Sequence, residues 1–107
     1  MGIFNRFKKS DKPDTVSRGF HAINIKELTH LNGGAVQVSF DIPVHLQQEF
    51  HFIPGQYLNI EVLVNGKKER RAYSICSGPN EALAVAVKRV GNGLVSNFLN
   101  DQSSTDF

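Results

Sequence analysis

The segment Arg71–Ser74 combines side chains that suit a ligand with both a phosphate and a flat ring. It follows an Asn-Gly pair between two alternating segments, which predicts the return strand of a β-hairpin. Alternation along that strand puts Arg71 and Tyr73 on one face and Ser74 on the other. Arginine offers a planar fork for phosphate, and tyrosine offers an aromatic face with a polar tip. Taken alone, such a pair is more often an edge-strand arginine beside a half-buried tyrosine.

A second candidate begins at Lys88 and Arg89, which precede a glycine-rich turn and a short helical pattern. Glycines before a helix let backbone N–H groups approach an anion at the positive helix end. Ser96, in the first turn, adds a hydroxyl donor. The alternative is a turn in which Asn92 or Gly93 only caps the helix, and the residues alone support both interpretations equally.

Composition excludes several other chemistries. A chain of 107 residues is one domain with a modest core, and a net charge of +2 is too small to indicate nucleic-acid binding. Cys76 is the only cysteine, so this chain predicts neither an internal disulfide nor a four-thiolate iron–sulfur cluster. The histidines show no metal-ligand spacing, so no metal site is expected. Nothing resembles a signal peptide or a transmembrane run, which makes the cytoplasm the default location.

The elements that must position these residues follow from alternating apolar positions. Periodicity predicts strands over 20–28, 36–42, 58–64, 69–75 and 83–87, one helical turn within 44–52, and a helix over 94–101. Short strands separated by turn residues and followed by one helix predict an all-β antiparallel barrel with a capping helix.

Four motifs occur in one order along the chain: PGQY at Pro54–Tyr57, RAYSICS at Arg71–Ser77, VKR at Val87–Arg89 and GLVSNFL at Gly93–Leu99. Together they resemble the FAD-binding domain of the ferredoxin–NADP reductase family, over about residues 20–99. Within the family, FHFIPGQY at Phe50–Tyr57 and RRAYSICS at Arg70–Ser77 are most similar to the reductase components of phenylacetyl-CoA epoxidases and their close relatives. Those reductases join flavin, NAD(P) and plant-type ferredoxin domains in one chain. The resemblance implies a Greek-key-type flavin barrel of an oxidoreductase that passes electrons from NAD(P)H through FAD to an iron–sulfur or other one-electron carrier.

The resemblance also implies a role for each matched residue. Arg71 would bind the FAD pyrophosphate. Tyr73 would lie against the isoalloxazine ring and Ser74 would hydrogen-bond near its reactive N5, so these two are the candidate catalytic residues. The remaining implied cofactor contacts are Val87, Lys88 and Arg89 along the ribityl and phosphate region, and Gly93 and Ser96 at the pyrophosphate. Gln56 and Tyr57 would mainly shape the barrel beside the flavin.

The family barrel has six strands, and the sixth follows the helix. We therefore expect a polar N-terminal arm over 1–18 and a C-terminally incomplete barrel over 19–107 that contains five of the six strands. The NAD(P)H and [2Fe–2S] sites of a parent protein would lie in missing domains, leaving this fragment inactive with NAD(P)H. Its partners would be an NAD(P)H-binding domain and a ferredoxin domain or oxygenase component, without nucleic acid or membrane. Self-association through the open barrel edge is also expected.

An alternative from another class is a small basic β-barrel that has no flavin. It would bind single-stranded nucleic acid, with Tyr73 and Phe98 stacking on bases and Lys88 and Arg89 contacting phosphates. A barrel that only contacts a protein partner is the other form of this alternative. Colour separates these classes, because a flavin-loaded protein is yellow.

Overall fold

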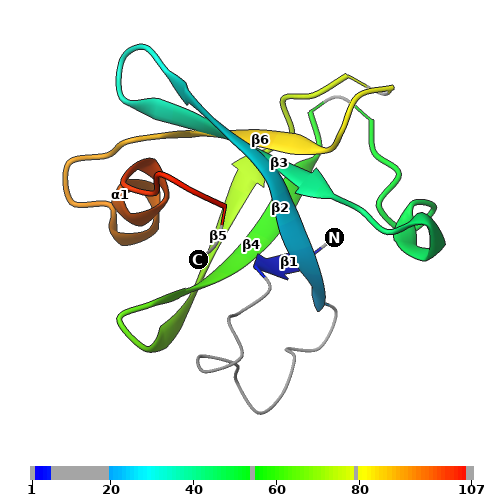
Figure 1. Ribbon diagram of the computed structural model, residues 1–107, viewed down its shortest axis with the longest axis horizontal. Helices are drawn as coiled ribbons and strands as arrows, with labels where there is room; N and C mark the ends of the chain where they lie inside the picture. The colour runs from blue at the N-terminus through cyan, green and yellow to red at the C-terminus, as the bar shows by residue number, and fades with distance from the viewer. Residues whose placement is uncertain (1, 6–19, 54, 79, 106–107) are drawn as a thin grey trace.

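A computed structural model describes residues 2–5, 20–53, 55–78 and 80–105. Its strands form one curled sheet in the order β5-β4-β1-β2-β3-β6 (Figure 1). The elements are β1 Gly2–Asn5, β2 Phe20–Leu31, β3 Ala35–Asp41, the 3-10 turn η2 Val44–Leu46, β4 Tyr57–Val64, β5 Lys67–Ser74, β6 Ala84–Lys88 and α1 Leu94–Asn100. The all-β antiparallel barrel with one short helix is thus confirmed, apart from the pairing of β1.

The hairpin between β4 and β5 forms where the Asn-Gly pair predicts it. Asn65 and Gly66 have φ of 52° and 80°, the left-handed values that a tight two-residue hairpin turn requires. Antiparallel pairing then runs from Val64–Lys67 to Tyr57–Ser74. This register carries the candidate residues of β5 along the full length of β4.

The two outer strands of the sheet, β5 and β6, meet through a bridge between Ile75 and Val85. The barrel interior is filled by branched apolar side chains from the strands and by phenylalanines. The buried core comprises Ile3, Ile23, Ile25, Val36, Val38, Phe40, Phe50, Phe52, Leu58, Ile60, Val62, Val64, Ile75, Leu83, Val85, Val87, Val95 and Leu99. Its last two members come from α1, which closes one end of the barrel.

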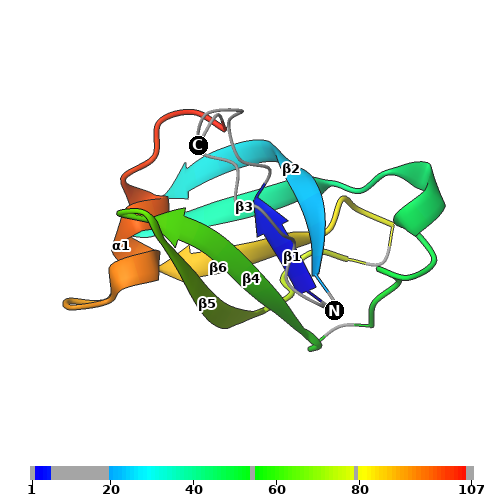
Figure 2. The same ribbon diagram turned by 90° about the horizontal axis from the view of Figure 1, so that it is seen from below.

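Helix α1 and turn η2 lie at opposite ends of the molecule (Figures 1 and 2). Val95 and Leu99 anchor α1 at a spacing of four residues, which places both on one helical face. Among the residues that the structure describes, no helix has the length and apolar character needed to cross a membrane.

The N-terminal segment differs from expectation. Residues 2–5 form β1, which lies between β2 and β4 and is parallel to both. Ile3 is fully buried and enters the core. The described chain thus contains a sixth strand that the sequence did not predict, and this strand pairs with Phe20–Ile23 and with Asn59–Glu61. Strands β5 and β6 remain the outer strands of the sheet. The rest of the expected arm, residues 6–19, lies outside the described residues.

Candidate functional site

Strand β5 presents Arg71 and Tyr73 on the inner face of the sheet. Tyr73 lies opposite Leu58 in the β4–β5 register, and directly opposed residues share a face. Leu58 is buried, and Tyr73 packs half-buried against the same core. Arg71, two residues earlier on the same face of β5, is exposed, and its Nη1 donates to the Arg70 carbonyl at 2.6 Å. The two side chains thus lie on one face, as the sequence predicts.

The neighbouring Arg70 points to the outer face, where it is already engaged. Its Nε donates to the buried Glu61 carboxylate at 2.8 Å, and its guanidinium lies 4.6 Å from the centre of the Phe20 ring. Arg71 makes no such ion pair among the described residues. Of these two arginines, Arg71 is therefore the one available to an anion.

Burial is the larger influence on the Tyr73 phenol. It raises the pKa of Tyr73 above the ordinary 10.0, while the nearby Arg71 charge lowers that pKa. The phenol therefore remains protonated at neutral pH. A neutral ring beside an exposed guanidinium suits a flat ligand that also carries negative charge.

The edge of β5 that faces β6 carries backbone groups as well as side chains. The Ile75 N–H donates to the Gln56 carbonyl at 2.8 Å. Every second residue of a strand directs its backbone groups to the same side, so Tyr73 and Arg71 also direct theirs toward β4. Ser74 and Ala72, which alternate with these residues, direct their backbone N–H and C=O groups toward β6. The Cys76 N–H follows the same rule, because it donates to the Ala84 carbonyl at 2.9 Å. Ser74 is exposed at this edge of the strand.

Strands β5 and β6 separate beyond the Ile75–Val85 bridge. Continuing that register would bring Tyr73 opposite Val87 and Arg71 opposite Arg89, yet no ladder forms there in the described chain. Helix α1 contacts both strands beyond the bridge. The fold therefore brings the two candidate regions to the two sides of one gap.

The structure places the three residues of the VKR motif differently from one another. Lys88 is exposed on the outer face of β6. Val87 has no exposed surface, and its carbonyl accepts from Asn100 Nδ2 at 3.1 Å. The Arg89 guanidinium turns to α1, where Nη2 contacts Asp101 at 2.7 Å. Lys88 thus has the only free side chain of the three in this described segment.

Gly93 and Ser96 are packed against one another at the start of α1. A Cβ on Gly93 would lie 2.3 Å from Ser96 Oγ, so any side chain there would force Ser96 or the turn to shift. The Ser96 hydroxyl is buried, accepts from the Val90 N–H at 3.3 Å and donates to the Gly93 carbonyl at 3.4 Å. These two hydrogen bonds of Ser96 stabilise the turn before α1.

Tyr57 is a candidate that sequence reasoning assigned only to barrel shape. It lies opposite Ser74 in the β4–β5 register and is 63% exposed. Gln56 does shape the turn, because its Oε1 accepts from the Ile53 N–H at 2.8 Å. Pro54 lies outside the described residues. The signal for Tyr57 was the hairpin register itself, which puts residue 57 beside residue 74.

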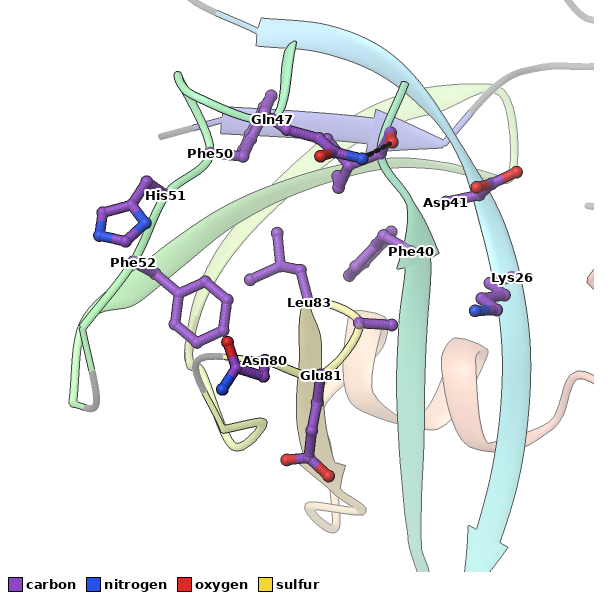
Figure 3. Close-up of a pocket in the computed structure, with 12 residues that line it drawn as sticks. Lys26, Phe40, Asp41, Gln47, Phe50, His51, Phe52, Asn80, Glu81 and Leu83 are labelled. Atoms are coloured by element: carbon purple, nitrogen blue, oxygen red, sulfur yellow. Dashed lines mark hydrogen bonds between the residues drawn. The ribbon is translucent and has the colours of Figure 1, made fainter. Parts of the chain in front are cut away.

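A separate cavity of about 440 Å³ lies at the η2 end of the barrel (Figure 3). Phe40, Phe52 and Leu83 contribute apolar side chains, and Lys26 and Asp41 lie at its edge. None of the predicted cofactor residues lines it. The candidate cofactor site is therefore the gap between β5 and β6, at the α1 side of the molecule.

The fold is a curled β-sheet with one capping helix. Its exposed Arg71 and half-buried Tyr73 suit a cofactor that carries both a phosphate and an aromatic ring. The family model for the oxidoreductase FAD-binding domain matches residues 22–106. The chain therefore belongs to the oxidoreductase FAD-binding domain family.

Similar proteins fit this assignment. One component of the 1,2-phenylacetyl-CoA epoxidase from Escherichia coli (strain K12) is 35% identical over 81 residues, covering 74% of this chain and 22% of that protein. The ferredoxin reductase component of 3-ketosteroid-9-alpha-monooxygenase from Mycobacterium tuberculosis (strain CDC 1551 / Oshkosh) is 38% identical over 76 residues, covering 64% and 20%. The chain thus spans about a fifth of the length of these relatives.

A solved structure supports the fold. The flavohemoglobin from Malassezia yamatoensis, crystallised with bound FAD and heme, aligns with a TM-score of 0.58 at 17% identity. The alignment covers 78% of this chain and 22% of that one.

The described residues fit FAD. Arg71 is exposed and free of an acidic partner among those residues, which suits a pyrophosphate. Tyr73 offers a half-buried ring, and the neighbouring Ser74 is exposed. Val87 and Ser96 fit less directly, because both side chains are buried.

Proposed function

We propose that this chain is the FAD-holding domain of an NAD(P)H-dependent oxidoreductase that passes electrons to an iron–sulfur or other one-electron carrier. The observation that carries the proposal is the parting of β5 from β6, with Arg71 and Tyr73 on one side of the gap and Lys88 on the other. Bound FAD would accept a hydride and release electrons singly, while the protein would fix its position and surroundings.

In this proposal Arg71 contacts the pyrophosphate through a charge-assisted hydrogen bond. Tyr73 lies against the flat ring and excludes water from that face, with its phenol protonated. Ser74, through its hydroxyl and its N–H at the strand edge, donates toward the reactive nitrogen of the ring. Lys88 adds positive charge from the outer face of β6, and Tyr57 lies beside Ser74 on the outer face of β4.

The turn and helix start complete the phosphate end of this proposed site. Gly93 allows close packing, and Ser96 holds the turn that carries the backbone past the gap. Val87 contributes through its main chain, since its side chain is buried in the core.

The proposed partners follow from the similar proteins. Two of them are named as parts of multi-component oxygenating enzymes, an epoxidase and a monooxygenase. We therefore propose that electrons leave this domain for a ferredoxin domain or an oxygenase component, after entering from an NAD(P)H-binding domain. Phenylacetate oxidation is the proposed pathway on the similarity to the epoxidase component.

Reconstitution tests the proposal. The purified chain is mixed with excess FAD, passed through a gel-filtration column and measured for flavin absorbance and protein concentration. We expect a yellow protein with about one FAD per chain. A colourless protein that retains a single-stranded oligonucleotide would favour the nucleic-acid alternative instead.

A further inference from the structure

Arg89 spans the distance between the end of β6 and the last turn of α1. Its Nη2 contacts the Asp101 carboxylate at 2.7 Å, and its Nη1 donates to Asn97 Oδ1 at 3.2 Å. Its backbone N–H donates to the Gly34 carbonyl at 2.7 Å, which fixes the residue to the β2–β3 turn. Both ends of the guanidinium and the main chain are therefore occupied by this chain's own groups.

Two asparagines of α1 reach the same segment. Asn97 Nδ2 donates to the Val90 carbonyl at 3.1 Å, and Asn100 Nδ2 donates to the Val87 carbonyl at 3.1 Å. Together with Asp101 they follow one another at helical spacing, so they form one polar face of α1. This face is directed at residues 87–91, the segment that joins β6 to α1.

Helix α1 needs such contacts because it is short. It has seven residues, and its N-cap Gly93 provides no side-chain cap. Helices of this length are marginal in water, so tertiary contacts must supply their stability. The core contacts of Val95 and Leu99 hold one face, and Arg89 holds the polar face with Asn97 and Asp101.

We propose that Arg89 is a positioning residue, which fixes α1 and the turn before it through Asp101 and Asn97, and does not itself bind the FAD phosphates. This inference rests on the proposed function and corrects one of its expected contacts. To reach a phosphate, the guanidinium would have to leave both partners on α1. Lys88, whose side chain is exposed on the preceding residue, is then the basic residue of β6 that remains for the ligand.

The two roles predict opposite effects when Asp101 is removed. If Arg89 fixes α1, Asp101→Ala loosens the helix and weakens FAD binding by about three- to tenfold. If Arg89 binds phosphate directly, Asp101→Ala releases the guanidinium, and FAD binding stays equal or becomes tighter. Asp41→Ala is the matched control, because it removes one exposed carboxylate at the other end of the barrel.

The experiment measures FAD dissociation constants for wild type, Arg89→Ala, Asp101→Ala and the double variant. For a positioning residue that acts through Asp101, the double variant binds FAD no more weakly than the weaker single variant. Asp101→Glu, which keeps the carboxylate, should restore affinity to within about twofold of wild type. Equal or tighter FAD binding by Asp101→Ala, or full loss of binding in Asp101→Glu, would overturn the proposal.

A second readout needs no flavin. Amide hydrogen exchange of the unliganded chain should be faster over residues 94–100 in Arg89→Ala and Asp101→Ala, and unchanged in Asp41→Ala. Unchanged exchange in both the Arg89 and the Asp101 variants contradicts the positioning role whatever FAD does. If wild type fails to bind FAD while these two variants still exchange faster, the proposed function fails and the structural role of Arg89 stands.

Discussion

Arg71 differs from the other arginines near the gap in having no acidic partner in the described chain. Arg70 is held by Glu61 and Arg89 by Asp101, while Arg71 Nη1 donates to the Arg70 carbonyl. Sequence alone could not sort these arginines. The strand alternation that sends Arg70 outward and Arg71 inward was predictable, but the burial of Glu61 on the outer face was not.

Arg71→Ala tests the phosphate contact. Losing a charge-assisted hydrogen bond should cost about 1.5–3 kcal/mol, which weakens FAD by roughly tenfold to a hundredfold. Fluorescence titration of FAD with each protein measures this. Lys67→Ala is the control, since it removes one exposed positive charge from the same strand. Equal weakening by both variants would mean a general charge effect without a specific contact.

Tyr73 should titrate above an ordinary tyrosine. The chain has two tyrosines, so Tyr57→Phe leaves Tyr73 alone to report by phenolate absorbance. Burial favours the protonated phenol, and we expect a midpoint above 10.0 that rises further in the additional absence of the Arg71 charge. The stability from this burial is present below pH 10.0 and is lost as pH rises through the raised pKa. A midpoint at or below 10.0 would contradict the half-buried ring.

At the scale of single elements, the sequence predicts the β-hairpin and α1 well, because their signals are local. The Asn65-Gly66 turn and the apolar spacing of α1 each lie within a few residues of the element they define. The parting of β5 from β6 has no such signal. This separation depends on where two strands that are distant in sequence meet, at Ile75 and Val85, and on how α1 packs beyond that bridge.

Gly93→Ala tests the packing at the start of α1. The new Cβ would lie 2.3 Å from Ser96 Oγ and 3.1 Å from the Val90 Cβ, so the turn must shift. We expect a loss of about 1–3 kcal/mol in the free energy of unfolding, measured by urea denaturation. Gly91→Ala is the control, because nothing lies within 4 Å of its Cβ position. Equal stability of the two variants would show that the turn is looser than described.

At the scale of the whole molecule, the position of β1 is what the sequence did not predict. Residues 2–5 read as part of a polar arm, because Ile3 stands among charged and polar neighbours without a sustained period. Parallel pairing between β2 and β4 joins segments far apart along the chain, and no local pattern encodes it. Strand β1 thus joins β2 to β4, while the outer strands β5 and β6 meet only at the Ile75–Val85 bridge.

Ile3→Ala measures how much β1 contributes to the barrel. Ile3 is fully buried, so truncation should leave a cavity and cost about 2–5 kcal/mol of unfolding free energy. Val44→Ala, at an 85% exposed position, should change stability by no more than about 0.5 kcal/mol. If Ile3→Ala is as stable as wild type in the same thermal and urea melts, β1 does not hold the place described for it.

The most direct test of the flavin site is an NMR titration of the isotopically labelled chain with FAD, in which the chemical shift of each backbone amide is recorded. The gap between β5 and β6 predicts the largest shifts over residues 71–76 and 86–94, from both sides of the opening. The amide signals of Lys26, Asp41 and Glu81, which lie around the cavity at the η2 end, should stay near their chemical shifts in the free protein. The largest shifts at that cavity, or no saturable shifts at all, would contradict the assignment of the β5–β6 gap as the FAD site.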